Sequence, residues 1–247
     1  SEDWIGAEPA SPFGYTIVAD GTLDRGLYPN IEKLAQDLHA QGIRFLVYYF
    51  PYLIEDLDDD GLPRKGSDYA EGLEKGYVLK DASGRPYNFL MITRRVAQVD
   101  LTNPEAREWH KSILRRAISL GADGWMADFG EYTPLDAVAF DGMSGLALRN
   151  AFPLQWQKLN REVWDEARPN GDYVFFTRSG YTGTQEYSPV SWPGDQNTDW
   201  SLLDGIPSIL PSALALGISG QPVFGHDIAG YTTIPGAKNT DQDLFDR

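Results

Sequence analysis

Short apolar and aromatic runs alternate with amphipathic helical stretches along the chain, and this alternation restricts the fold more than any other feature. The run at 43–50 is apolar almost throughout, as expected of a strand that is covered on both faces. Further runs occupy 123–129, 173–178, 189–192 and 222–227. Strands that alternate with helices are typical of βαβ units around a parallel sheet.

Helical patterns fill the intervals between these runs. They cover 31–41, 104–120, 144–168 and 203–216, and another helix is expected to begin after Asn239. Asn103 before Pro104 is typical of a helix N-terminus, and Pro153 predicts a kink in the third helix. The polar stretch 55–68 predicts an exposed loop.

The charge balance and the cysteine count exclude several classes of protein. With 21 Lys and Arg against 36 Asp and Glu, the net charge is −15, whereas proteins that track a nucleic-acid strand need clustered positive charge. The longest apolar runs fall short of the ~20 residues that a membrane-crossing helix requires. The chain has no cysteine, which excludes disulfides and thiolate metal sites. We therefore expect neither nucleic acid nor a membrane as a partner, and the compartment stays open.

Polar and aromatic residues gather directly after each predicted strand. They occupy 51–52, 128–132, 178–181, 194–199 and 227–231. In a (β/α)8 barrel, the loops at the C-terminal ends of the strands build the active site. A doubly wound sheet places its ligand similarly, but no glycine-rich phosphate-binding run follows any strand here. We expect a single TIM-type barrel domain over residues 1–247.

Two carboxylates at predicted strand ends are the strongest candidates for catalysis. Asp128 follows an apolar strand with aromatic residues on either side, as suits a nucleophile, although an Asp that caps the loop is the alternative. Asp195 follows Trp192 and a Pro-Gly pair; the tryptophan would keep it protonated as a general acid, and an ordinary turn residue is the alternative. Glycosidases that retain configuration hold two such carboxyl groups about 5 to 5.5 Å apart. Neighbouring strand ends could provide that separation.

Arginine and aromatic side chains support a carbohydrate site. Arg178 ends a predicted buried strand, where a guanidinium needs carboxylate partners that Asp128 and Asp195 would supply. Aromatic rings suit the apolar faces of sugars, although some are expected to fill the layer between barrel and helices. Those near the expected cleft are Trp4, Trp125, Phe129, Tyr132, Tyr181, Trp192, Trp200 and Tyr231.

Competing chemistries have weaker support in the sequence. The three histidines, His39, His110 and His226, are not at metal-ligand spacing, and the first two are expected at the surface of predicted helices. No serine has the surroundings of a nucleophile elbow. A magnesium site at Asp199 and Asp204 stays open, but no phosphate-binding loop accompanies it. We expect neither a metal nor a cofactor.

Three stretches resemble the catalytic barrel of glycoside hydrolase family 31, the retaining α-glycosidases. Residues 124–134 (GWMADFGEYTP) are similar to the nucleophile segment of that family, and residues 175–201 (FFTRSGYTGTQEYSPVSWPGDQNTDWS) to its arginine strand and acid/base segment. Within the family, these stretches and 225–233 (GHDIAGYTT) are most similar to the sulfoquinovosidase branch, which releases a 6-sulfonated glucose from α-glycosides. The resemblance runs through nearly the whole chain.

Carried over position by position, the resemblance implies a role for each matching residue. Asp128 would be the nucleophile and Asp195 the general acid and base. The residues implied for the sugar subsite are Glu2, Asp3, Phe129, Arg178, Trp192, Asp227 and Tyr231.

The chain departs from the sulfoquinovosidase branch at the positions that would contact a sulfonate. Glu2 stands where the branch has Gln, and Thr16 and Ala19 stand where it has an Arg and a Trp. A desolvated sulfonate needs cationic or strong donor partners. Arg25 is a candidate substitute from the same loop, Tyr231 is the one matching sulfonate-facing residue, and a further His would lie beyond the last residue. A neutral-sugar α-glucosidase or related α-glycosidase therefore stays open.

The sequence thus predicts a retaining, exo-acting α-glycosidase that works by double displacement on a small-molecule or oligosaccharide α-glycoside. A carbohydrate-binding homologue without activity is the alternative from another class. The resemblance also implies that the first barrel strand, most of the second and the eighth fall outside the chain. Such an incomplete barrel would have open sheet edges and would be unstable or prone to association on its own.

Overall fold

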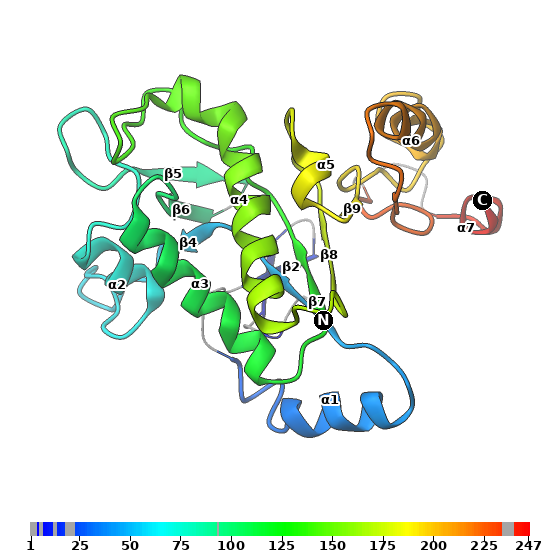
Figure 1. Ribbon diagram of the computed structural model, residues 1–247, viewed down its shortest axis with the longest axis horizontal. Helices are drawn as coiled ribbons and strands as arrows, with labels where there is room; N and C mark the ends of the chain where they lie inside the picture. Colours follow the sequence, from blue (N-terminus) through cyan, green and yellow to red (C-terminus); the bar gives the residue numbers. More distant parts are fainter. Residues whose placement is uncertain (1–3, 5–6, 12–13, 18–22, 93, 234–239) are drawn as a thin grey trace.

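Four parallel strands form the central sheet of the computed structural model (Figure 1), which describes the chain except for residues 1–3, 5–6, 12–13, 18–22, 93 and 234–239. The strands are β3 (Leu46–Tyr49), β7 (Gly124–Ala127), β8 (Val174–Thr177) and β9 (Val190–Ser191), in the order β3-β7-β8-β9. Each lies within a predicted apolar run, and helices join them, as in a (β/α)8 barrel. The sheet is an incomplete TIM-type barrel, as predicted.

The predicted last strand at 222–227 is wrong as a full strand. Only Phe224 pairs with the sheet, through an isolated parallel bridge to Ser191. Pro222 has no amide hydrogen to donate to a ladder, and Pro222 and Val223 are exposed to solvent. The bridge nevertheless places a fifth parallel segment beside β9.

The main predicted helices are confirmed. They are α1 (Ile31–Ala40), α3 (Pro104–Ser119) and α4 (Gly145–Ala167), and the predicted uneven helix is a 3₁₀ turn, η2 (Ile206–Ser208), followed by α6 (Ile209–Ile218). Asn103 caps α3 by accepting from the Glu105 amide at 3.0 Å. Two further short helices are α5 (Thr184–Tyr187) and α7 (Gln242–Asp246), the latter where a helix was expected after Asn239. Within the described residues, no helix is both long and apolar enough to cross a membrane.

The region between β3 and α3 contains structure that the sequence did not predict. A three-stranded antiparallel sheet forms there from β4 (Tyr52–Ile54), β6 (Arg94–Gln98) and β5 (Asn88–Met91), in the order β4-β6-β5, next to the short helix α2 (Asp68–Glu74). Near the N-terminus, β1 (Ala7–Ser11) and β2 (Gly14–Ile17) pair as an antiparallel hairpin. The predicted loop 55–68 links β4 to α2 and is largely exposed.

The two faces of the parallel sheet carry different side chains, because successive residues of a strand point to opposite sides. Val47, Tyr49, Trp125 and Phe175 belong to the core that α3 and α4 cover, and these helices lie side by side in Figure 1. Tyr48 points the other way, into a second cluster that the antiparallel sheet also lines. Trp4 and Trp125, two of the aromatics expected near the cleft, are completely buried in the first core.

His110 is buried, so its predicted place at the surface is wrong. Its ring lies 5.5 Å from the Trp156 ring, where α3 packs on α4, and only 2% of the residue is exposed. Neither ring nitrogen has a hydrogen-bond partner among the described residues. Burial lowers the pKa of His110 to about 3, because an imidazolium there would lose its hydration without gaining a counter-charge.

Replacing His110 with Leu is expected to make the protein less sensitive to acid. Between about pH 6.5 and 3, the unfolded state protonates this histidine and the folded state does not, so stability falls as the pH falls, by up to about 1.4 kcal/mol per pH unit. Thermal unfolding midpoints of the full-length protein at pH 7 and pH 5 would measure the difference. His226→Gln removes an exposed histidine and is the matched control. If the unfolding midpoint of His110→Leu falls between pH 7 and pH 5 by as much as that of wild type, the prediction is contradicted.

Candidate active site

The register of the parallel strands brings three of the predicted site residues into one layer. Met126 pairs with Phe176, and Phe176 pairs with Val190. Two residues further along each strand, the same register aligns Asp128, Arg178 and Trp192. Two backbone hydrogen bonds extend the ladders to these positions. The Asp128 amide donates to the Tyr49 carbonyl, and the Trp192 amide donates to the Thr177 carbonyl, both at 2.9 Å. All three side chains therefore lie at the C-terminal edge, on the face away from α3 and α4.

Asp128 is held by donors from two elements. The Tyr48 hydroxyl donates to its Oδ2 at 2.7 Å, and the Phe129 amide donates to its Oδ1 at 2.8 Å. Phe129 has a φ of 57°, which is uncommon for a residue with a side chain. Such backbone conformations cluster at functional sites, and this one turns the Phe129 amide back onto the carboxylate.

Burial governs the protonation of Asp128, which is 5% exposed. Desolvation raises the pKa of its carboxyl group to about 6, and the charge of Asp195 acts in the same direction. The positive charge of Arg178 opposes the rise, as do the hydrogen bonds from Tyr48 and the Phe129 amide. Above about pH 6 the carboxylate is therefore ionised while still poorly hydrated, which is the state that a nucleophile needs.

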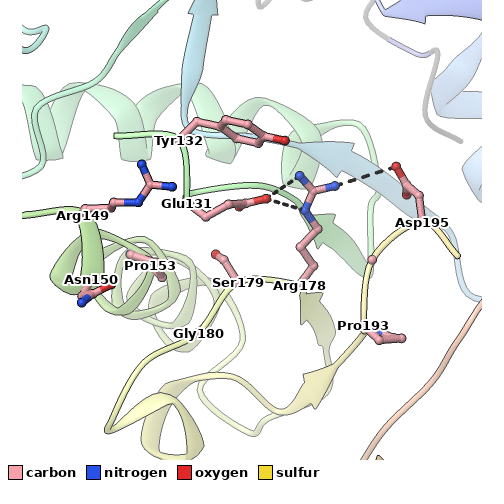
Figure 2. Close-up of a pocket in the computed structure, with 11 residues that line it drawn as sticks. Glu131, Tyr132, Arg149, Asn150, Pro153, Arg178, Ser179, Gly180, Pro193 and Asp195 are labelled. Atoms are coloured by element: carbon pink, nitrogen blue, oxygen red, sulfur yellow. Dashed lines mark hydrogen bonds and ion pairs between the residues drawn. The ribbon is translucent and has the colours of Figure 1, made fainter. Parts of the chain in front are cut away.

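Arg178 lies between three carboxylates. Its Nε is 3.4 Å from Asp128 Oδ1, and its Nη1 is 3.8 Å from Asp195 Oδ2. Its Nε and Nη2 both donate to Glu131 Oε1, at 2.9 and 2.5 Å, as Figure 2 shows. Burial alone would lower the pKa of Arg178. The three carboxylates outweigh this effect, so the pKa of Arg178 is raised above its usual value. The guanidinium also lies 4.0 Å from the centre of the Phe129 ring.

Asp195 is the more accessible of the two predicted catalytic carboxylates. It follows β9 and Gly194, whose φ of 96° permits the turn, and 34% of its side chain is exposed. It lines a cavity of about 510 Å³ (Figure 2). The cavity is bounded by Glu131, Tyr132, Arg149, Asn150, Pro153, Arg178, Ser179, Gly180, Pro193, Gly194 and Asp195.

The remaining described candidates extend the site from Trp192. Its indole Nε1 donates to Asp227 Oδ2 at 3.1 Å, and its ring meets the edge of Phe176. The Tyr231 amide donates to the Gln196 carbonyl at 2.8 Å, which ties this segment to the residue after Asp195. The Tyr231 residue is 51% exposed.

The residues predicted near the sugar and its sulfonate at the N-terminal end of the chain are mostly outside the described part. Glu2, Asp3, Ala19 and the side chain of Thr16 lie outside the part that the structure describes. Arg25, the candidate substitute, is exposed and binds both oxygens of Glu32, at 2.8 and 2.5 Å. The guanidinium of Arg25 is therefore already paired with a neighbouring carboxylate at the surface.

Sequence reasoning missed Tyr48 and Glu131. Tyr48 belongs to the apolar run 43–50, and strand alternation could have placed it on the face of Asp128. Glu131 lies within the nucleophile segment, but only the structure shows that it binds Arg178. Across the described ranges, no three His, Asp or Glu side chains are grouped so that they could hold a metal ion.

Comparisons with known proteins place this chain in a family. The model of the glycosyl hydrolases family 31 TIM-barrel domain matches residues 7–247. A sulfoquinovosidase of Escherichia coli K12 is 39% identical over 95% of this chain and 33% of its own length, and one of Agrobacterium fabrum is 34% identical over 97% and 35%. The chain thus spans about a third of the length of these curated relatives.

Solved structures agree with the sequence comparisons. A GH31 family sulfoquinovosidase from E. rectale, in complex with the aza-sugar inhibitor IFGSQ, matches 99% of this chain and 35% of its own chain, with 37% identity and a TM-score of 0.89. A GH31 dextranase of Flavobacterium johnsoniae, at 23% identity and a TM-score of 0.76, shares the fold over 92% of this chain and 28% of its own. The chain therefore belongs to glycosyl hydrolase family 31 and forms part of the TIM-barrel domain of that family.

Proposed function

We propose that the protein is a retaining, exo-acting α-glycoside hydrolase whose nucleophile is Asp128 and whose general acid and base is Asp195. The observation that carries the proposal is the approach of both carboxylates to one guanidinium, that of Arg178, at the C-terminal edge of the sheet. This edge is where barrel enzymes keep their catalytic groups. We further propose that residues 1–247 form a single catalytic domain.

The reaction would follow a double displacement. Asp128 attacks the anomeric carbon while Asp195 gives its proton to the leaving oxygen, and a covalent glycosyl-enzyme forms. Asp195 then takes a proton from water, which attacks the same carbon and releases the sugar with its original configuration. The carboxyl groups carry the chemistry without a cofactor.

The two environments support this division of roles. Asp128 is buried and accepts two hydrogen bonds, which fix the orientation of its oxygens toward a bound ring. Asp195 is partly exposed and lines the cavity, so it can reach the leaving oxygen in the first step and the incoming water in the second. Trp192, bonded to Asp227, and the exposed Tyr231 would line the sugar subsite together with Phe129 and Arg178, and Asp3 and Glu2 are proposed contacts from the N-terminal segment.

The sugar is proposed to be a sulfoquinovoside. Two relatives named sulfoquinovosidase are 39% and 34% identical to the chain, whereas an α-xylosidase of Lactiplantibacillus pentosus is 27% identical. The second candidate is a neutral-sugar α-glucosidase or related α-glycosidase. Thr16 and Ala19 favour it, because neither side chain offers the cation that a desolvated sulfonate needs.

Rates on matched substrates would separate the two sugars. With the full-length protein, kcat/KM for 4-nitrophenyl α-sulfoquinovoside is expected to exceed that for 4-nitrophenyl α-glucoside by about 10⁴-fold, because a site built to bind a polar group rejects an analogue that lacks it. Equal rates, or a preference for the glucoside, would assign the neutral sugar. Binding of either sugar with turnover of neither would instead favour an inactive carbohydrate-binding homologue.

A further inference from the structure

The contact between Arg178 and Glu131 differs in kind from the contacts that Arg178 makes with the two proposed catalytic residues. Glu131 Oε1 accepts two hydrogen bonds from the guanidinium, at 2.9 and 2.5 Å. Asp128 and Asp195 lie 3.4 and 3.8 Å from it, beyond the 2.7–2.9 Å typical of a charge-assisted hydrogen bond. Arg178 therefore acts on both through its charge while its hydrogen bonds go to Glu131.

This division matters because an arginine beside a buried carboxylate tends to bind it through two parallel hydrogen bonds. Such a pairing with Asp128 would occupy the oxygen lone pairs that attack the anomeric carbon and would hold the pKa of the carboxyl group low. A pairing with Asp195 would equally disfavour the protonated state that a general acid needs. Arg178 thus requires another acceptor that competes with Asp128 and Asp195 for the hydrogen bonds of its guanidinium.

We propose that Glu131 is a positioning residue that holds Arg178 away from direct hydrogen bonding with Asp128 and Asp195. The inference rests on the proposed roles of these two carboxylates. It assigns to Glu131 no contact with substrate. Glu131 would affect the reaction only by fixing the position of the Arg178 guanidinium.

The backbone around Glu131 is anchored on both sides, as a positioning role requires. On one side, the Ser179 hydroxyl donates to the Phe129 carbonyl at 2.6 Å, which fastens the loop to the end of β8. On the other, the Tyr132 amide donates to the Tyr52 hydroxyl at 3.1 Å, which fastens it to β4. The Phe129 ring against the guanidinium limits movement of Arg178 in a further direction.

The groups that face Asp128 determine the sign of the expected pH effect. They are Tyr48 from β3, Arg178 from the end of β8 and Asp195 from the loop after β9, with Glu131 beyond Arg178. Without the Glu131 carboxylate, Arg178 is free to move onto Asp128 and stabilise its ionised form. The acid limb of kcat/KM, which reports the nucleophile of the free enzyme, would then move to lower pH.

The test compares Glu131→Gln and Glu131→Ala with wild type in the full-length protein, with an aryl α-glycoside that the wild type hydrolyses. We expect kcat to fall by about 10- to 100-fold, as for small displacements in an active site, and the acid limb to move down by about one pH unit. Added formate is expected to restore part of kcat in Glu131→Ala by binding to Arg178, whereas chloride at equal ionic strength is not. Asp136→Asn, an exposed carboxylate-to-amide change on the same loop, is the matched control and should match wild type.

A lowered kcat with an unmoved acid limb and no response to formate would overturn the proposal, since loss of structure alone gives that result. Wild-type kcat in both variants would overturn it as well. The isosteric Glu131→Gln keeps the test available if Glu131→Ala fails to fold. Failure of the proposed function has a different signature, because wild type would then hydrolyse no α-glycoside or Asp128→Ala would remain active.

Discussion

Replacing Asp128 with Asn is expected to lower kcat by roughly 10⁴-fold or more, because an amide cannot form the glycosyl ester and the loss of a nucleophile removes the covalent pathway. Asn keeps the shape of the side chain, and its amide oxygen can still accept from the Tyr48 hydroxyl or the Phe129 amide. The loss of activity should therefore occur in a folded protein. Initial rates and thermal unfolding midpoints of the full-length protein measure the two effects separately.

The nucleophile can also be identified without relying on loss of activity. A fluorinated glycoside that forms the glycosyl-enzyme but hydrolyses slowly should lose its leaving group and add the mass of its glycosyl group to the peptide that contains Asp128. Asp141→Asn, on the loop before α4, is the control substitution because its carboxylate accepts only from the nearby Met143 amide in the described contacts. Label on another carboxylate, or turnover of Asp128→Asn within tenfold of wild type, would contradict the assignment.

The pH profile provides a further expected result for the same residue. Burial raises the pKa of Asp128 to about 6, and attack requires the ionised form. Activity is therefore expected to decline as the pH falls through about 6, whereas an exposed aspartate would remain ionised down to about pH 4. A kcat/KM profile that stays flat down to pH 4 would contradict this expectation.

The layer that contains Asp128, Arg178 and Trp192 could be predicted because it depends on local signals. Each of the three residues lies at or next to the end of a predicted apolar run, and parallel strands end at a common edge. The sequence therefore predicted which side chains meet at the sheet edge. The distances between these side chains depend on the register of neighbouring strands, which the sequence of a single strand does not determine.

The parts that were missed depend on contacts between distant segments. Glu131 and Arg178 are 47 positions apart, and the sequence around either residue does not indicate that the two pair. The antiparallel strands β5 and β6 contain Asn88, Arg94 and Arg95, polar residues that weaken an apolar pattern. The sequence predicts His110 at the surface of a helix, yet the packing of α3 on α4 buries it.

Replacing Asp195 with Ala is expected to affect substrates according to their leaving groups. For an alkyl α-glycoside, whose leaving oxygen needs a proton, the first step should slow by about 10²- to 10⁴-fold, the usual contribution of a general acid. For an aryl α-glycoside with an acidic phenol, the first step should slow much less, because the phenolate departs without protonation. The ratio of the two kcat/KM values, in Asp195→Ala relative to wild type, is the measurement.

Azide extends the argument to the second step, in which Asp195 would activate water. Asp195→Ala leaves no base beside the glycosyl-enzyme, so hydrolysis stalls, but azide attacks without one. Added azide is expected to accelerate turnover of the aryl glycoside in this variant and to yield an α-glycosyl azide, because two inversions at the anomeric carbon restore the starting configuration. In wild type azide should have little effect, since Asp195 already activates water. A product of inverted configuration, or equal slowing of alkyl and aryl substrates, would show that Asp195 is not the acid and base and that its approach to Arg178 at 3.8 Å serves the fold instead.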